Sequence, residues 1–210
     1  RAGHISRQET ASMLPVVAIG IEPHHRVLEL CAAPGSKTMQ ILDKLNSGHD
    51  LVPSGMLVAN DYKLNRLKMV IDRARRIPSA PLLVTCADAR SWPGVTTAGD
   101  NKTACFDRVL CDVPCSGDGT VRKALGILSQ WTPLSGVSYH SDQLAILRRG
   151  LELLNPGGLL AYSTCAVNPV ECEAVVAAAL WEFRGLVELE QVCVPCLRLA
   201  EGLTTWRVPS

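Results

Sequence analysis

The sequence has few aromatic residues and no long apolar run. Phe, Trp and Tyr make up 4% of its 210 residues, and the longest apolar stretch is Ala174–Trp181. A helix that crosses a bilayer needs about 20 apolar residues, so the sequence predicts no membrane partner. Residues 1–12 are mostly polar or charged, unlike a signal peptide. The net charge of +1 does not by itself indicate a nucleic-acid-binding protein.

Cysteine, in contrast, is plentiful. The nine cysteines are an odd number, and several lie inside apolar, strand-like runs. Both observations argue against a disulfide framework and for a reducing, intracellular location, either the nucleus or nucleolus or the cytoplasm. For most of these thiols a buried structural role is the default interpretation.

We expect residues 1–210 to form a single domain, because a chain of this length can bury a sizeable core and no repeat or linker divides it. Residues 1–22 are predicted to form a lead-in helix docked on that domain. The chain begins at Arg1 and not at Met, so we expect it to be a fragment of a longer protein.

Short β-branched runs alternate with helical stretches. This order indicates βαβ units, and therefore an α/β, Rossmann-like fold whose mostly parallel sheet has helices on both faces. A turn at Asn155–Gly158 is expected before the last strand, and Asn168 is expected to cap the last helix, with Pro169 just inside its start. The predicted strands are 26–31, 56–61, 82–87, 105–112 and 159–165, and the predicted helices are 36–45, 63–76, 134–154 and 169–183.

Residues able to carry chemistry follow these strands. Ligands of parallel sheets bind beyond the carboxyl ends of the strands. One shared site therefore explains the pattern better than several unrelated caps or turns, although Asp is common in such turns. The candidates are Cys31, Asp61, Asp88, Asp112, Cys115 and Cys165.

The loop after the first strand narrows the choice of cofactor. It has a single glycine, Gly35, whereas a dinucleotide site needs G-x-G-x-x-G. Gly35-Ser-Lys37-Thr38 imitates the end of a phosphate-binding P-loop but lacks its first glycine. S-adenosylmethionine carries no phosphate and suits a tight backbone turn. Asp61 would then accept hydrogen bonds from its ribose hydroxyls, and Asp88 would serve its adenine end.

Two thiols and a carboxylate suit methylation of a pyrimidine. Carbon 5 of the ring is a poor nucleophile until a thiolate adds to carbon 6, and a free cysteine is only a few per cent thiolate at pH 7. Asp112 would assist by donating a proton to N3 if burial raised its pKa enough. Cys115 and Cys165 would supply the nucleophile and a second group that assists the final elimination.

Three motifs in order resemble the Sun family of RNA cytosine-5 methyltransferases. They are Cys31-Ala-Ala-Pro-Gly-Ser-Lys-Thr, Cys111-Asp-Val-Pro-Cys-Ser-Gly-Asp-Gly-Thr and Tyr162-Ser-Thr-Cys. Ile5-Ser-Arg-Gln-Glu and Gly202-Leu-Thr-Thr-Trp-Arg add similarity to the eukaryotic multisite tRNA methyltransferase branch. The resemblance covers nearly the whole chain.

The resemblance implies roles for individual residues. Cys165 is the nucleophile on carbon 6, Cys115 helps release the product, Asp112 contacts the cytosine, and Lys37 reaches into the active site. By this resemblance the partner is RNA, specifically tRNA, and the loop 116–122 lines the RNA side. The resemblance implies no metal, and the oligomeric state stays open. The implied residues for S-adenosyl-L-methionine are Cys31, Ala32, Ala33, Pro34, Gly35, Ser36, Lys37, Asp61, Arg66, Asp88 and Asp112.

Other interpretations compete with this one. DNA cytosine-5 methyltransferases pair a Pro-Cys nucleophile with a Glu-Asn-Val motif that is missing here, while Thr164-Cys165 is additional. A catalytically inactive RNA-binding scaffold and a nucleotide-hydrolysing switch built on Gly35–Thr38 are the alternatives from other classes. Ala166 and Cys172 depart from the family pattern without removing a group that the mechanism needs.

Further features have a structural and a functional interpretation. Cys193-Val-Pro-Cys196 has the C-x-x-C spacing of a redox pair or half a zinc site but no second pair. His24 and His25 are expected in a surface turn. Trp131 and Tyr139 would either pack or stack on bases, and the basic residues of 63–76 would form either a solvated helix face or a phosphate-contacting patch.

Overall fold

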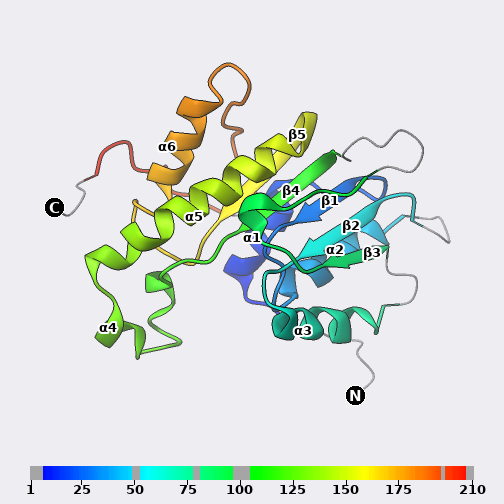
Figure 1. Cartoon of the computed structure of the whole chain (residues 1–210), viewed down its shortest axis with the longest axis horizontal. Helices are drawn as coiled ribbons and strands as arrows, with labels where there is room; N and C mark the ends of the chain where they lie inside the picture. Colours follow the sequence, from blue (N-terminus) through cyan, green and yellow to red (C-terminus); the bar gives the residue numbers. More distant parts are fainter. Residues whose placement is uncertain (1–6, 49–52, 78–80, 97–104, 195–196, 207–210) are drawn as a thin grey trace.

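The structure is a computed structural model that describes residues 7–48, 53–77, 81–96, 105–194 and 197–206. Its centre is a five-stranded parallel sheet with the strand order β3-β2-β1-β4-β5 (Figure 1). The predicted fold class is therefore confirmed. The strands are β1 (Arg26–Glu29), β2 (Met56–Asn60), β3 (Leu82–Thr85), β4 (Phe106–Asp112) and β5 (Leu154–Ser163).

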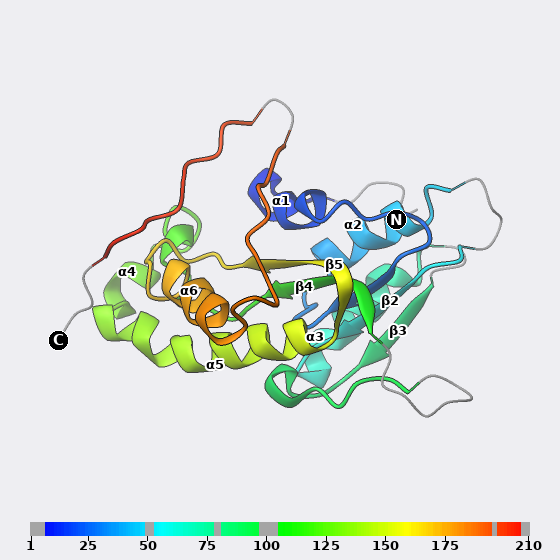
Figure 2. The ribbon, with the colours of Figure 1, turned by 90° about the horizontal axis from the view of Figure 1, so that it is seen from above.

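Helices cover both faces of the sheet (Figure 2). One face packs against α1, α2 and α3, and the other packs against α5 and the short turn η1, with α6 lying outside on α5. Neighbouring residues of β1 consequently face different cores, since Val27 joins the first and Leu28 the second. The helices are α1 (Thr10–Ala18), α2 (Ser36–Leu45), α3 (Leu64–Ala74), α4 (Ile127–Gln130), α5 (Pro133–Glu152) and α6 (Glu173–Glu182), with 3₁₀ turns η1 (Ala89–Ser91) and η2 (Asp118–Thr120).

The lead-in segment docks on α2 through side-chain amides. Gln8 Nε2 donates to Gln40 Oε1 (2.9 Å), and Gln40 Nε2 donates to the carbonyl of Met13 (3.1 Å). Val16 of α1 and Ile19, which directly follows α1, are buried in the core. Residues before Arg7 lie outside the described part, so α1 accounts for only part of the predicted segment. No helix of the described residues has the length and apolar character needed to span a membrane.

Most boundaries predicted between residues 26 and 183 differ from the structure by at most two residues, but two, both near turns, were wrong by four or more. The last strand begins at Leu154, because Leu154 already pairs with Phe106 and the intervening Asn155–Gly158 turn is accommodated as a register shift. The last helix begins at Glu173 and not at Pro169. Asn168 is a cap of a different kind, since its side-chain oxygen accepts from the N–H of Glu171 in the turn before the helix.

Helix α5 approaches the sheet closely at Gly150. A Cβ there would lie 2.9 Å from Cys111 Sγ and 2.9 Å from Leu160 Cδ1. Replacing a helical Gly by Ala ordinarily stabilises by about 1 kcal/mol, but overpacking a core costs about 1–3 kcal/mol. We therefore expect Gly150→Ala to lower the free energy of unfolding by about 1 kcal/mol, the difference between these two effects, measured by urea denaturation.

The matched control is Gly126→Ala, where an added Cβ meets no atom within 4 Å and the change should stay within about 0.5 kcal/mol. A Gly150→Ala variant as stable as the parent chain would contradict the packing described for α5.

Candidate active site

The loop between β1 and α2 is held by its own backbone and by β2. The Ala32 N–H donates to the carbonyl of Asn60 (2.7 Å), and the Gly35 N–H donates to the carbonyl of Ala32 (2.8 Å). Gly35 has φ +94°, and a Cβ on it would lie 3.2 Å from the Val70 Cα. The turn thus requires glycine at this position for two reasons, its left-handed backbone and its close contact with α3.

Asp61 fixes this loop from the end of β2. Its carboxylate accepts from the N–H groups of Ala33 and Lys63, each at 3.0 Å. Arg66 completes the unit, with its guanidinium 3.7 Å from Asp61 and a 2.6 Å hydrogen bond to the Ala33 carbonyl. The structure thus brings together three residues predicted for the cofactor, although the Asp61 side chain is only 4% exposed. Its contact with ribose hydroxyls stays a prediction.

Asp88 also lies past the end of its strand, where it caps η1. Its carboxylate pairs with Arg90 at 2.6 Å, and Arg90 continues to Asp142 on α5 at 2.8 Å. The Arg90 hydrogen bonds hold the pKa of Asp88 below its ordinary value. In this arrangement Asp88 joins β3 to α5, and its predicted role at the adenine end remains untested.

Lys37 and Asp112 form the ion pair that joins the loop to β4. Lys37 Nζ lies 2.6 Å from Asp112 Oδ2, and the Ser163 hydroxyl donates to Asp112 Oδ1 at 2.7 Å. The Asp112 side chain is 33% exposed. The burial on which its predicted proton donation depended is therefore modest, and both oxygens accept hydrogen bonds here. The structure places Lys37 against Asp112, and the role of both residues in an active site stays a prediction.

Glu29 is a site residue that the sequence reasoning missed. It is 1% exposed, and Thr38 donates a 2.6 Å hydrogen bond to its carboxylate. Burial raises its pKa to about 8. It lines a cavity of about 190 Å³ together with Ser12, Ala32, Ala33, Pro34, Ser36, Lys37 and Asp112. The available signal was a single acidic residue inside the apolar strand 26–31.

The two predicted catalytic thiols are in contact. Cys115 Sγ and Cys165 Sγ lie 3.1 Å apart, which is a hydrogen-bonded pair of thiols and not a disulfide. The hydrogen bond from Cys115, with a smaller contribution from the charge of Lys37, lowers the pKa of Cys165 to about 7. The same contact raises the pKa of Cys115. Cys165 is therefore the thiol of this pair that is favoured as a thiolate, and its role as the nucleophile stays a prediction.

Glycines let the loop after Cys115 lie against Cys165. The Gly119 N–H donates to the Cys165 carbonyl at 3.0 Å, and a Cβ on Gly119 would lie 2.6 Å from that oxygen. Gly117 has φ +74° and would place a Cβ 3.9 Å from Cys165 Sγ. The loop predicted to line the RNA side therefore borders Cys165, the predicted nucleophile.

The remaining thiols differ from this pair. Burial raises the pKa of Cys31, Cys111 and Cys172 above the ordinary value, so their thiolates are disfavoured. Cys31 therefore belongs to the predicted cofactor site through its position before the loop and not through a reactive sulfur. Cys196 lies outside the described residues, so the Cys193–Cys196 pair has no structural account.

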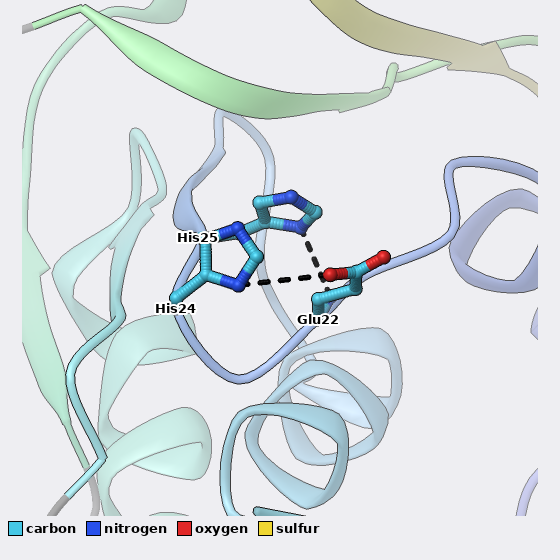
Figure 3. A group of neighbouring side chains, drawn as sticks. All are labelled: Glu22, His24 and His25. Carbon is cyan, nitrogen blue, oxygen red and sulfur yellow. Dashed lines mark hydrogen bonds and ion pairs between the residues drawn. The ribbon is translucent and has the colours of Figure 1, made fainter.

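Glu22, His24 and His25 form a cluster of potential metal ligands before β1 (Figure 3). His24 is exposed as expected for a surface turn, but His25 is only 7% exposed. His25 Nδ1 accepts the Glu22 N–H at 2.9 Å, and His24 Nδ1 lies 3.6 Å from the Glu22 carboxylate. Because the Nδ1 lone pair of His25 already closes the turn, we propose no metal site there.

The predicted RNA-contacting residues have several different surroundings. Trp131 Nε1 donates to Ser116 Oγ at 3.3 Å, so it supports the Cys115 loop. Tyr139 is 36% exposed on α5. The basic residues of 63–76 are exposed, and one of them, Arg73, donates to Ser36 Oγ at 3.0 Å.

A parallel sheet with a glycine turn after its first strand and reactive groups at its carboxyl edge defines the chain as a Rossmann-like methyltransferase domain. Comparisons agree with this class. A methyltransferase homolog protein from Pyrococcus horikoshii superposes with a TM-score of 0.68 at 30% identity, covering 87% of this chain and 53% of that one. NSun6 from the same organism, solved with SFG, gives a TM-score of 0.77 at 23% identity, covering 92% and 45%.

Residues 16–199 match the family described as 16S rRNA methyltransferase RsmB/F, and the chain belongs to this family. It is 44% identical over 212 residues to the multisite-specific tRNA:(cytosine-C(5))-methyltransferase of Saccharomyces cerevisiae, covering 98% of this chain and 31% of that protein. It is 43% identical over 214 residues to the tRNA (cytosine(34)-C(5))-methyltransferase of Drosophila melanogaster, covering 99% and 29%. The chain thus spans about a third of the length of these relatives.

The lowered pKa of Cys165 predicts its reactivity. Alkylation of Cys165 by iodoacetamide, followed by peptide mass spectrometry, should show a midpoint near pH 7. Cys115→Ala removes the S–H donor and should move this midpoint upward, whereas Cys115→Ser keeps a donor and should move it less. Identical midpoints in the parent chain and the alanine variant would show that Cys115 does not tune Cys165.

The raised pKa of Glu29 predicts that the stability of the fold depends on pH. Its pKa is about 8 when folded and 4.5 as the ordinary value, so between these pH values the folded chain binds more protons than the unfolded chain. The free energy of unfolding therefore falls as pH rises through this window, by up to about 1.4 kcal/mol per pH unit from this group.

Glu29→Gln should remove the pH dependence that Glu29 gives to the free energy of unfolding. The variant should therefore become more stable relative to the parent chain as pH rises toward 8, as measured by urea denaturation at several pH values. Parallel pH profiles for the two proteins would refute the assignment.

Proposed function

We propose that this chain is the catalytic domain of an S-adenosylmethionine-dependent enzyme that methylates carbon 5 of cytosine in tRNA. The observation that carries the proposal is the Cys115–Cys165 contact at 3.1 Å, beside the Lys37–Asp112 ion pair. The names of the two tRNA cytosine-C(5) relatives support the substrate class. Family membership supports methyl transfer.

The residues present fit the cofactor. The Gly35 turn exposes backbone in place of a side chain, and the adjoining cavity is bordered by Glu29 and Asp112. The Asp112 carboxylate suits a cationic sulfonium and amino group, whereas Glu29, with a pKa of about 8, adds little negative charge at neutral pH. When bound, S-adenosylmethionine supplies an electrophilic methyl group. Ala33, Asp61 and Arg66 would hold the turn that receives it.

Cys165 would begin the reaction. Its thiolate forms a bond to carbon 6, and the ring electrons move toward carbon 5 and N3. The Lys37 ammonium, 2.6 Å from Asp112, provides the proton that stabilises the charge gained by N3. Ser163 and Lys37 together fix Asp112 at the edge of the base. The target cytosine must leave its stack to reach this position.

Cys115 would end the reaction. After the methyl group has been transferred, carbon 5 must lose its proton and the bond between carbon 6 and Cys165 must break. Once Cys165 is a neutral thioether, it no longer opposes ionisation of Cys115 through a neighbouring negative charge. Cys115, once its own proton has passed to solvent, accepts the carbon 5 proton; the proton on N3 returns to Lys37, and Cys165 leaves as a thiolate.

The test is trapping of the intermediate. Cys115→Ala, incubated with S-adenosylmethionine and unmodified tRNA, should accumulate a protein–RNA adduct that survives a denaturing gel, because attachment is retained and release is slowed. The matched control is Cys115→Ala combined with Cys165→Ala, which should form none. Transfer of labelled methyl to uracil or to protein, with none to cytosine, would overturn the proposal.

A further inference from the structure

Two buried side chains hold the peptide groups on either side of Cys115. Gln143 Nε2 donates to the carbonyl of Pro114 at 2.9 Å, and the N–H of Ser116 donates to Glu171 Oε1 at 2.8 Å. Gln143 and Glu171 are both 0% exposed. The thiol-bearing residue is therefore fixed from its preceding carbonyl and from its following N–H.

Glu171 lies at the centre of this arrangement. Besides the Ser116 N–H, its carboxylate accepts from the Ser116 hydroxyl (2.5 Å), from Gln143 Nε2 (2.9 Å) and from Asn168 Nδ2 (2.6 Å). Among the described residues these donors are uncharged, and no ion pair of Glu171 is found. Burial of a carboxylate without a cation is unfavourable unless its oxygens are fully hydrogen-bonded. Four donors meet that requirement.

The geometry leaves Gln143 one orientation. Both contacts of its Nε2 are oxygen acceptors, so exchanging the amide oxygen and nitrogen would place oxygen against oxygen. The cost of this choice is that Gln143 Oε1 is buried without a partner among the described residues. The structure tolerates this unsatisfied oxygen because the amide N–H groups of Gln143 both donate hydrogen bonds, one to the Pro114 carbonyl and one to Glu171.

The same network reaches the Cys165 side. Asn168 Nδ2 also approaches Asp118 (3.2 Å), and Asp118 accepts the N–H of Val167 at 2.7 Å. Side chains from α5 and from the turn before α6 consequently connect, by hydrogen bonds, the segments that follow Cys115 and Cys165. These two segments are 50 residues apart in sequence. Loss of Glu171 would free the Cys115 side while leaving the backbone of Cys165 held by Gly119.

We propose that Glu171 is a positioning residue that holds Cys115 within hydrogen-bonding distance of Cys165, so that product is released. Its catalytic consequence rests on the function proposed above. Glu171→Gln keeps the shape but has only one acceptor oxygen for four donors. The Ser116 anchor weakens, Cys115 moves away from Cys165, and the covalent intermediate accumulates, because attachment needs only Cys165 whereas release needs both thiols.

The first experiment measures the covalent adduct with S-adenosylmethionine and tRNA on a denaturing gel, alongside single-turnover and steady-state methylation. Glu171→Gln should raise the adduct fraction several-fold over the parent chain and lower steady-state turnover about tenfold or more, with the single-turnover rate less affected. Tyr162→Phe is the matched control, because it removes a hydrogen bond to the Glu171 carbonyl but leaves the Ser116 anchor. It should lower stability without raising the adduct fraction.

The second experiment needs no RNA and no cofactor. The pH midpoint of Cys165 alkylation should rise in Glu171→Gln, as is expected of Cys115→Ala, and should stay unchanged in Tyr162→Phe. An unchanged midpoint in folded Glu171→Gln, or equal losses of adduct and turnover in both variants, would overturn the positioning role. If Cys115→Ala forms no adduct while the Glu171→Gln midpoint still rises, the proposed function fails and the positioning of Cys115 stands.

Discussion

The parallel pairing of β1, β4 and β5 is the constraint on which the rest of the site depends. Glu29 lies opposite Leu110, and Asp112 lies opposite Ser163. The carboxyl ends of all three strands therefore lie together at the same end of the sheet. Helix α2, which carries Lys37, and the segments that carry Cys115 and Cys165 then start close to one another.

Much of this edge could be predicted from the sequence because its signals are local. An apolar run that ends in Cys, Asp or Pro-Cys marks a strand and its carboxyl end, and parallel topology places those ends together. The ion pair of Lys37 with Asp112 and the contact of Cys115 with Cys165 follow from that geometry. Boundaries near Pro and Gly were less predictable, since the Asn155–Gly158 turn is absorbed into a strand as a register shift.

The supporting residues could not be predicted, because their role is set by tertiary contacts. Glu171 and Gln143 are ordinary polar residues in sequence, one in a turn and one in a helix, and only the fold places both against Pro114 and Ser116. Their effect depends on burial, which a helical pattern does not specify for a single polar side chain. Glu29 offered a signal, an acid in an apolar strand, whose meaning depends on the cavity beside it.

The Lys37–Asp112 ion pair has a thermodynamic consequence of its own. Lys37 belongs to α2, the helix after the cofactor loop, and Asp112 is the last residue of β4, shortly before Cys115. A ligand at the loop that shifts Lys37 changes the charge presented by Asp112 to a base. Linkage is reciprocal, so the base must change affinity at the loop by the same factor. Ligands bound at the loop and at Asp112 would then be coupled through this single 2.6 Å contact.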